Sequence, residues 1–137
     1  MTPGLLTPEL FWLTLTVILT GLLWLPYTLN RIMVRGLLGA MANPARDDRP
    51  HAPWATRLMF AHDNAIENLV VFASLILILN AIDYSTKSTV YAAAVYFWAR
   101  LAHVIVYTLG LPVFRTLVFT IAFVAQVVLA LAIFGLA

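Results

Sequence analysis

The sequence predicts an all-α integral membrane protein, a single four-helix bundle over residues 1–137. Its composition is the first reason, since 63% of the residues are hydrophobic and only 10% are charged, and the mean hydropathy is +0.94. The second reason is that the apolar residues form four runs long enough to cross a bilayer, separated by short polar segments. These runs occupy nearly all of the chain, which leaves no length for a separate soluble domain.

The first predicted helix covers residues 8–35, with Pro8 in its first turn. No basic residue precedes its apolar run, so we expect it to be retained and not removed as a signal peptide. Pro26 cannot donate one of the helical hydrogen bonds, which predicts a kink near that residue. Residues 36–53 form the one substantial polar loop, which contains three prolines and several charges.

Three further helices are predicted over residues 54–82, 89–109 and 112–135. Trp54 suits the membrane interface at the start of the first of these helices. The second and third are separated by a Gly-Leu-Pro break, and the last carries no charge after Arg115. The chain has no cysteine, so any thiol chemistry must use the sulfur of a cofactor.

Positive charge predicts the orientation of the bundle. Arg115 follows the third connection, and the opposite side has only Lys87 besides the amino terminus. The remaining arginines of the connections lie in or beside the long loop: Arg31, Arg35, Arg46, Arg49 and Arg57. The positive-inside rule therefore predicts a cytoplasmic loop, with both termini on the extracytoplasmic side. Aromatic residues do not interleave with these arginines, so a nucleic-acid surface is not expected.

A polar stripe crosses the third predicted helix. Arg100, His103 and Tyr107 are spaced i, i+3 and i+7, which places them on one helical face. An arginine within a membrane span costs about 2.5–3.5 kcal/mol on insertion scales, so it rarely faces lipid. On the second predicted helix, Asn64 and Glu67 are spaced i and i+3, with Arg57 two turns earlier on the same face.

Glu67 and Arg100 are the natural partners for one another, because each would be costly in the membrane alone. One interpretation is that this pair only joins two helices. The other is that it belongs to a ligand site, toward which Asn64, His103 and Arg115 also cluster. At this stage both interpretations stay open.

Three segments together resemble the MAPEG family, the membrane-associated proteins in eicosanoid and glutathione metabolism. They are AHDNAIEN at 61–68, ARLAHVIVY at 99–107 and GLPVFRT at 110–116, and the Ala-Asn-Pro turn at 42–44 also fits. The resemblance implies a homotrimer of four-helix bundles that binds glutathione between neighbouring subunits near the cytoplasmic side. Transferase and peroxidase members of this family conjugate or reduce lipophilic electrophiles.

The resemblance also implies roles for particular residues. Arg115 matches the arginine that stabilises the glutathione thiolate, which makes it the candidate catalytic residue. The matching glutathione-binding residues are Arg35, Asn64, Glu67, Arg100, His103, Tyr107 and Thr116. This set suits a ligand with two carboxylates and an ammonium group, and a guanidinium beside sulfur favours the thiolate over the thiol. An apolar second substrate can arrive through the bilayer.

Two residues depart from the family pattern. Asp63 stands where glutathione-using members commonly have a basic or amide residue, and Phe119 stands where tyrosine is common. These departures favour an alternative function as a non-catalytic lipid-binding or partner-binding protein, since the superfamily includes the five-lipoxygenase-activating protein. A proton-linked carrier using Glu67 and Arg100 is disfavoured by the apolar last helix.

The expected location is a bacterial-type inner membrane. The expected partners are further copies of this chain, membrane lipid, glutathione and a hydrophobic small-molecule substrate. No metal site is expected, because the three histidines, at positions 51, 62 and 103, lie on separate segments without carboxylates at ligand spacing. Gln126, deep in the last helix, is expected to join helices across a subunit interface.

Overall fold

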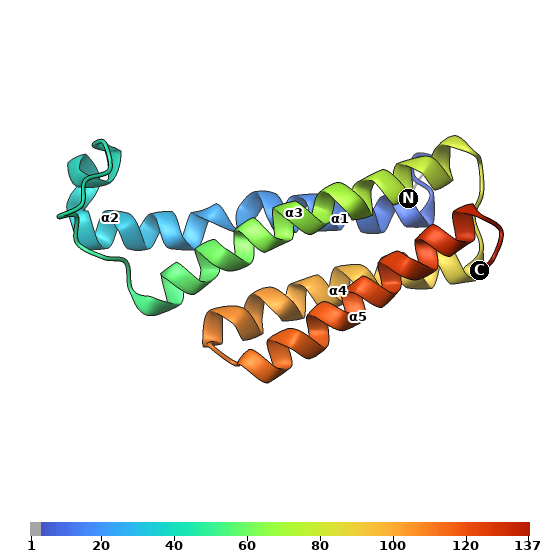
Figure 1. Cartoon of the computed structure of the whole chain (residues 1–137). Helices are drawn as coiled ribbons and strands as arrows, with labels where there is room; N and C mark the ends of the chain where they lie inside the picture. Colours follow the sequence, from blue (N-terminus) through green and yellow to red (C-terminus); the bar gives the residue numbers. More distant parts are fainter. Residues whose placement is uncertain (1–3) are drawn as a thin grey trace.

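A computed structural model describes residues 4–137 and shows an all-helical bundle (Figure 1). Its helices are α1 (Pro8–Leu22), α2 (Trp24–Met41), α3 (Pro53–Ala81), α4 (Lys87–Leu109) and α5 (Pro112–Ile133). α1 and α2 follow one another as the first span, and α3, α4 and α5 are each long and apolar enough to cross a membrane. The prediction of an all-α bundle with four spans is confirmed.

The first span is interrupted at two places. α1 ends and α2 begins around Leu23, whose amide donates to the Thr20 carbonyl at 3.4 Å, as in a tighter helical turn. Pro26 explains this break, because its ring clashes with the carbonyl four residues earlier. The second interruption is Gly36, whose φ of 74° and ψ of 167° are not helical. The structure thus divides the helix predicted over residues 8–35 and extends it past Gly36 by a bent final turn.

The core of the bundle lies among α1, α3, α4 and α5, and α4 and α5 form an antiparallel pair (Figure 1). Small residues allow these two helices to approach closely. The buried alanines are Ala92, Ala93 and Ala99 on α4 and Ala122, Ala125 and Ala132 on α5. Phe72 of α3 stacks on Tyr96 of α4 with 3.8 Å between ring centroids. Tyr96, 1% exposed, is thus a buried packing residue of the core.

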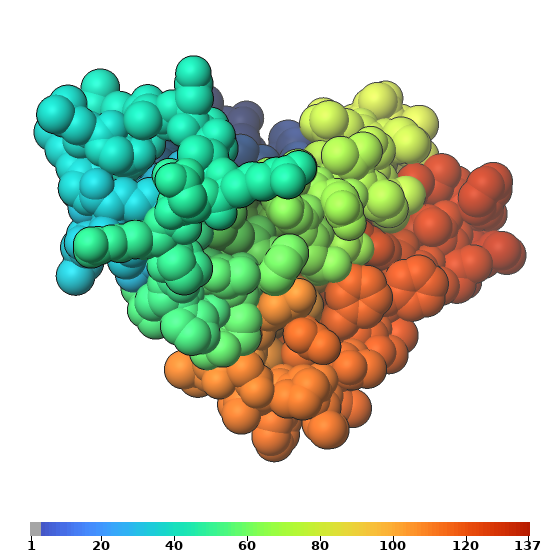
Figure 2. All heavy atoms as spheres, turned by 60° about the vertical axis from the view of Figure 1, so that its left-hand side comes forward, coloured from blue at the N-terminus to red at the C-terminus, as the bar shows by residue number. Residues whose placement is uncertain are grey.

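α2 packs mainly against α3 and extends past the α4–α5 pair (Figure 1). The loop at residues 42–52 folds back beside the end of α2, and the two lie together in the space-filling view (Figure 2). The fold therefore separates two polar regions. One lies inside the bundle where α3, α4 and α5 meet, and the other lies between α2 and the loop.

Candidate functional site

A polar cavity opens where α3, α4 and α5 meet. It has a volume of ≈190 Å³. Its lining residues are Asn64 from α3, His103 and Tyr107 from α4, and Arg115, Thr116 and Phe119 from α5. The structure thus brings five of the predicted site residues into one cavity, together with the phenylalanine that departs from the family pattern.

The tight connection between α4 and α5 creates this arrangement. α4 ends at Gly110 with a left-handed φ of 77°, and Pro112 begins α5 only two residues later. Arg57 of α3 fixes the connection, because its Nε donates to the Thr108 carbonyl at 2.9 Å. The sequence placed Arg57 on the same polar face as Asn64. Both side chains do face α4, since Asn64 binds Arg100 and Arg57 binds the Thr108 carbonyl, but Arg57 caps the end of α4 and does not line the cavity.

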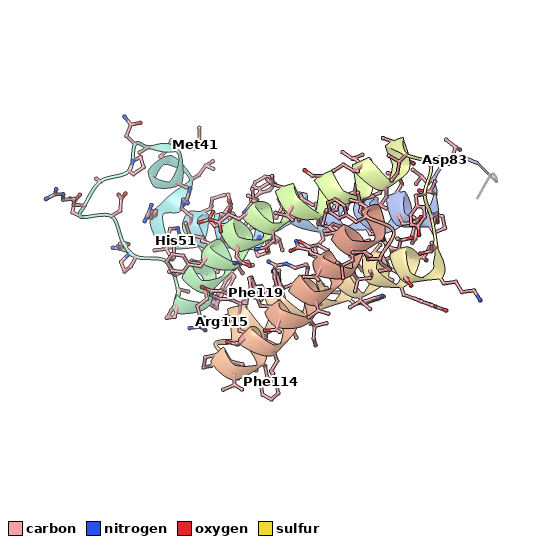
Figure 3. The ribbon with its side chains drawn as sticks, turned by 45° about the vertical axis from the view of Figure 1, so that its right-hand side comes forward. Met41, His51, Asp83, Phe114, Arg115 and Phe119 are labelled. Atoms are coloured by element: carbon pink, nitrogen blue, oxygen red, sulfur yellow. The ribbon has the colours of Figure 1, made fainter. Side chains whose placement is uncertain are left out.

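Arg115 lies against the aromatic wall of the cavity. Its guanidinium carbon is 4.6 Å from the centroid of the Tyr107 ring, which is a cation–π contact. The Tyr107 ring in turn meets the His103 ring edge-on, with 5.5 Å between centroids. Figure 3 places Arg115 and Phe119 on the side of α5 toward α3, and Phe114 on the opposite side. Among residues 4–137, no carboxylate forms an ion pair with this guanidinium.

Arg100 is buried next to the cavity, with 2% of its surface exposed. Its Nη2 donates to Asn64 Oδ1 at 2.7 Å, while its Nε and Nη1 have no partner among the residues that the structure describes. His103 is equally buried, and its Nδ1 also has no partner. Buried polar atoms of this kind are costly unless something satisfies them. The site thus retains hydrogen-bonding capacity on two α4 side chains.

The predicted ion pair between Glu67 and Arg100 is wrong within the chain. The one ion pair among residues 4–137 joins Arg35 and Asp48, and Glu67 is exposed. Glu67 follows Asn64 by three residues on α3, so the two side chains point about 60° apart around the helix axis. The neutral amide of Asn64 therefore binds Arg100 in place of the carboxylate.

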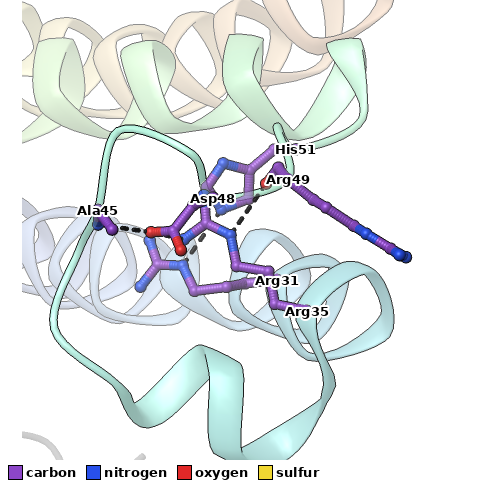
Figure 4. A network of polar contacts seen from close by, with 6 residues as sticks. All are labelled: Arg31, Arg35, Ala45, Asp48, Arg49 and His51. Atoms are coloured by element: carbon purple, nitrogen blue, oxygen red, sulfur yellow. Dashed lines mark hydrogen bonds and ion pairs between the residues drawn. The ribbon is translucent and has the colours of Figure 1, made fainter.

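Arg35 lies in the second polar region, away from the cavity lining (Figure 4). Its Nε donates to the Arg49 carbonyl at 2.9 Å, and its Nη1 lies 3.6 Å from Asp48 Oδ2. Arg31, one turn earlier, donates from Nε to His51 Nε2 at 3.2 Å. Burial lowers the pKa of His51, and the charges of Arg35 and Arg31 lower it further. His51, which the sequence alone suggests is a solvated loop residue, joins the loop to α2.

Several supporting residues were missed or misplaced by sequence reasoning. Gln126 Nε2 donates to the Asn68 carbonyl at 3.2 Å, so this glutamine joins α5 to α3 within one chain. The expected role across a subunit interface stays a prediction. Asn68 Nδ2 donates to the Asn64 carbonyl at 2.9 Å and lies 3.5 Å from Asn64 Oδ1. The i, i+4 spacing of the two asparagines was the available signal for this contact.

The fold and this site together define a class: a multi-pass membrane protein with a cationic, aromatic-walled cavity inside its helical bundle. Such a cavity can hold a small polar anion next to apolar helices. The sequence matches the MAPEG family over residues 10–135, and the chain belongs to this family. The family includes glutathione transferases and peroxidases as well as non-catalytic members. Comparisons with curated proteins and with solved structures gave no match.

Proposed function

We propose that the protein is a membrane-embedded glutathione-dependent transferase or peroxidase that acts on a hydrophobic electrophile. The observation that carries this proposal is the Arg115 guanidinium, which is held over Tyr107 in a cavity that no carboxylate lines. A positive charge that is not neutralised favours the charged form of a nearby acid. Bound beside Arg115, glutathione would therefore carry a larger fraction of nucleophilic thiolate at neutral pH.

The other cavity residues would hold and orient the tripeptide. Asn64 presents its amide, and Thr116 presents a hydroxyl that donates within α5 to the Pro112 carbonyl at 3.2 Å and can still accept. His103 carries an unused ring nitrogen. Arg100 keeps Asn64 in place by the bond to its amide oxygen. The exposed apolar residues of α5 offer the electrophile a route from the bilayer.

Glu67 and Arg35 would contribute to the site only when several copies of the chain assemble. Neither lines the cavity of its own chain, yet Glu67 is exposed on α3 and Arg35 lies on α2 beside the loop. We propose a homotrimer in which these two residues meet glutathione at a boundary between copies. The loop would face the cytoplasm and both termini the outside of an inner membrane, as the positive charges predict.

The decisive experiment changes Arg115 to alanine in the assembled protein in detergent. Thiolate absorbance against pH, with glutathione bound, should show a higher thiol pKa in Arg115→Ala than in the wild type, together with slower conjugation. Arg46→Ala is the matched control, because it removes one exposed arginine of the loop. A folded Arg115→Ala protein with the wild-type thiol pKa and the wild-type rate would remove Arg115 from the mechanism.

A non-catalytic binding protein is the second candidate, and Phe119 favours it. This side chain forms part of the cavity wall, 6.0 Å from the His103 ring between centroids, and it lacks a hydroxyl. The exposed Asp63 beside Asn64 also opposes an anionic ligand. Turnover assays with a chloronitroaromatic compound and a fatty-acid hydroperoxide discriminate between the two functions. Binding without turnover, and turnover gained by Phe119→Tyr, would support the non-catalytic protein.

A further inference from the structure

We propose that Asp48, in the loop after α2, competes with the ligand for Arg35. Its carboxylate pairs with the Arg35 guanidinium and must leave before a glutathione carboxylate can bind there. This inference rests on the proposed function, in which Arg35 contributes to glutathione binding. It adds a form of autoinhibition, since the loop and the ligand would compete for one guanidinium (Figure 4).

The contacts of Arg35 show that its guanidinium is already engaged. Its side chain is 17% exposed and that of Asp48 is 27% exposed, so solvent does not fully separate the two charges. Arg35 Nε is committed to the Arg49 carbonyl, and the Nη1 side faces Asp48. Each edge of a guanidinium holds one carboxylate in the bidentate geometry, and here the Arg49 carbonyl takes the Nε edge while Asp48 takes the Nη1 side. A second carboxylate therefore has to replace Asp48 to bind on that side.

A hydrogen bond within the loop holds the Asp48 carboxylate in place. Its Oδ2, the same oxygen that faces Arg35, accepts a hydrogen bond from the Ala45 amide at 2.8 Å. By contrast, the neighbouring Asp47 is exposed and makes no polar contact within residues 4–137. Two adjacent residues thus carry the same charge, and only one of them contacts Arg35.

The distance between the partners makes the pair displaceable. At 3.6 Å, Arg35 Nη1 and Asp48 Oδ2 form an ion pair but not a well-aligned hydrogen bond. Partly exposed pairs of this kind contribute little, typically less than about 1 kcal/mol. A ligand carboxylate able to align with the fork would form the stronger contact. The competitor would therefore weaken binding without preventing it.

The surroundings allow the exchange. A hollow of ≈530 Å³ adjoins the pair, lined by Val34, Gly36, Gly39, Asp47 and Arg49 besides the two partners. Gly39 keeps it open beside Arg35, because a Cβ there would stand 3.1 Å from Arg35 Cβ. The end of the loop has its own attachments, since the Ala52 amide donates to Asn30 Oδ1 at 3.1 Å. Asp48 can thus move away from Arg35 without detaching the end of the loop from α2.

Calorimetry with reduced glutathione tests the inference on the assembled protein in detergent. Asp48→Asn should bind glutathione about two- to fivefold more tightly than Asp47→Asn, in line with the small energy of such a pair. Both variants lose one negative charge, so the comparison cancels the general attraction of an anion. In an Arg35→Gln background, Asp48→Asn should give no gain. Equal affinities of the two single variants, or weaker binding by Asp48→Asn, would overturn the inference.

Hydrogen exchange of the wild type gives a second readout that needs no variant. Saturating glutathione should speed exchange of the Ala45 amide, because Asp48 would leave both Arg35 and that amide. Unchanged or slower exchange at Ala45 would contradict the inference. Failure of the proposed function looks different: a folded wild type that binds no glutathione would overturn that function and this inference with it.

Discussion

At one end of the bundle Glu9, 3% exposed, accepts hydrogen bonds from the hydroxyls of Ser85 and Thr89. At the other end Arg100, 2% exposed, donates to Asn64. Both ends bury a charged side chain, but the space beside Glu9 is only ≈30 Å³, about enough for one water molecule. The cavity lined by Asn64 has ≈190 Å³. Burial of a charge therefore indicates a binding site only where room for a ligand remains beside it.

The Asn64–Arg100 bond is where we expect the largest effect. Asn64→Leu should lower the free energy of unfolding by about 2–3 kcal/mol, because it removes a buried hydrogen bond to a charged group. Arg100→Leu should be costly alone, and the double variant should cost less than the sum. Unfolding in detergent, with Glu67→Gln as the control partner, measures the coupling. Coupling of Arg100 to Glu67 and not to Asn64 would restore the original ion-pair prediction.

Gly110→Ala disturbs the cavity end of the bundle without touching a cavity residue. The left-handed φ of 77° disfavours alanine by about 1–2 kcal/mol. The new Cβ would also stand 3.3 Å from Arg57 Nε, which caps α4. We expect reduced stability and weaker glutathione binding. Gly21→Ala, a helical position with open space around it, should not reduce stability. Equal behaviour of the two variants would show that the α4–α5 connection tolerates a side chain.

Glu9→Gln tests the closed end. The amide keeps the shape of the carboxylate but weakens the bonds from Ser85 and Thr89, so stability should fall by about 1 kcal/mol. Glutathione affinity, measured by calorimetry, should not change. A clear loss of affinity in a folded Glu9→Gln protein would contradict the separation of the two ends.

The smallest effect concerns pH and the loop. Arg31 donates to His51 Nε2, which requires a neutral ring. Because burial and the nearby arginines lower the pKa of His51, the detached loop binds more protons than the attached one. The attachment is thus complete above the ordinary pKa of about 6.5 and weakens as pH falls toward the lowered value. Relative to the intrinsic exchange rate at each pH, hydrogen exchange at residues 42–52 should rise on acidification in the wild type and stay constant in His51→Gln, which cannot titrate. Exchange that does not respond to pH in the wild type would exclude this role.

Much of the fold could be predicted because it depends on composition. The apolar runs, the prolines and the Gly-Leu-Pro break predict four spans, and the structure has them. The cavity was also largely predictable, since helical spacing places Arg100, His103 and Tyr107 on one face. The adjoining residues of α5 follow from the short connection.

The partners of these side chains were harder to predict. Periodicity places Asn64 and Glu67 within the same face, but it does not resolve which of them reaches Arg100. The prediction paired Arg100 with the oppositely charged Glu67, whereas in the structure the side chain of Asn64 is the one that reaches Arg100. The same difficulty applies to Arg57 and Gln126, whose bonds are to backbone carbonyls. Every residue offers a carbonyl, so sequence spacing cannot select one.

The first span has a length that the others lack. Its 34 residues reach about 51 Å if fully helical, against about 33 Å for the 22 residues of α5. A bilayer offers about 30 Å of hydrocarbon, so α5 matches the membrane and the first span exceeds it. A span longer than the hydrocarbon tilts, bends or extends into the headgroups and water. By extending, the end of α2 that carries Arg31 and Arg35 would avoid the cost of hydrocarbon. A water-soluble tripeptide and a lipid-soluble electrophile could then approach the same protein from two different solvents.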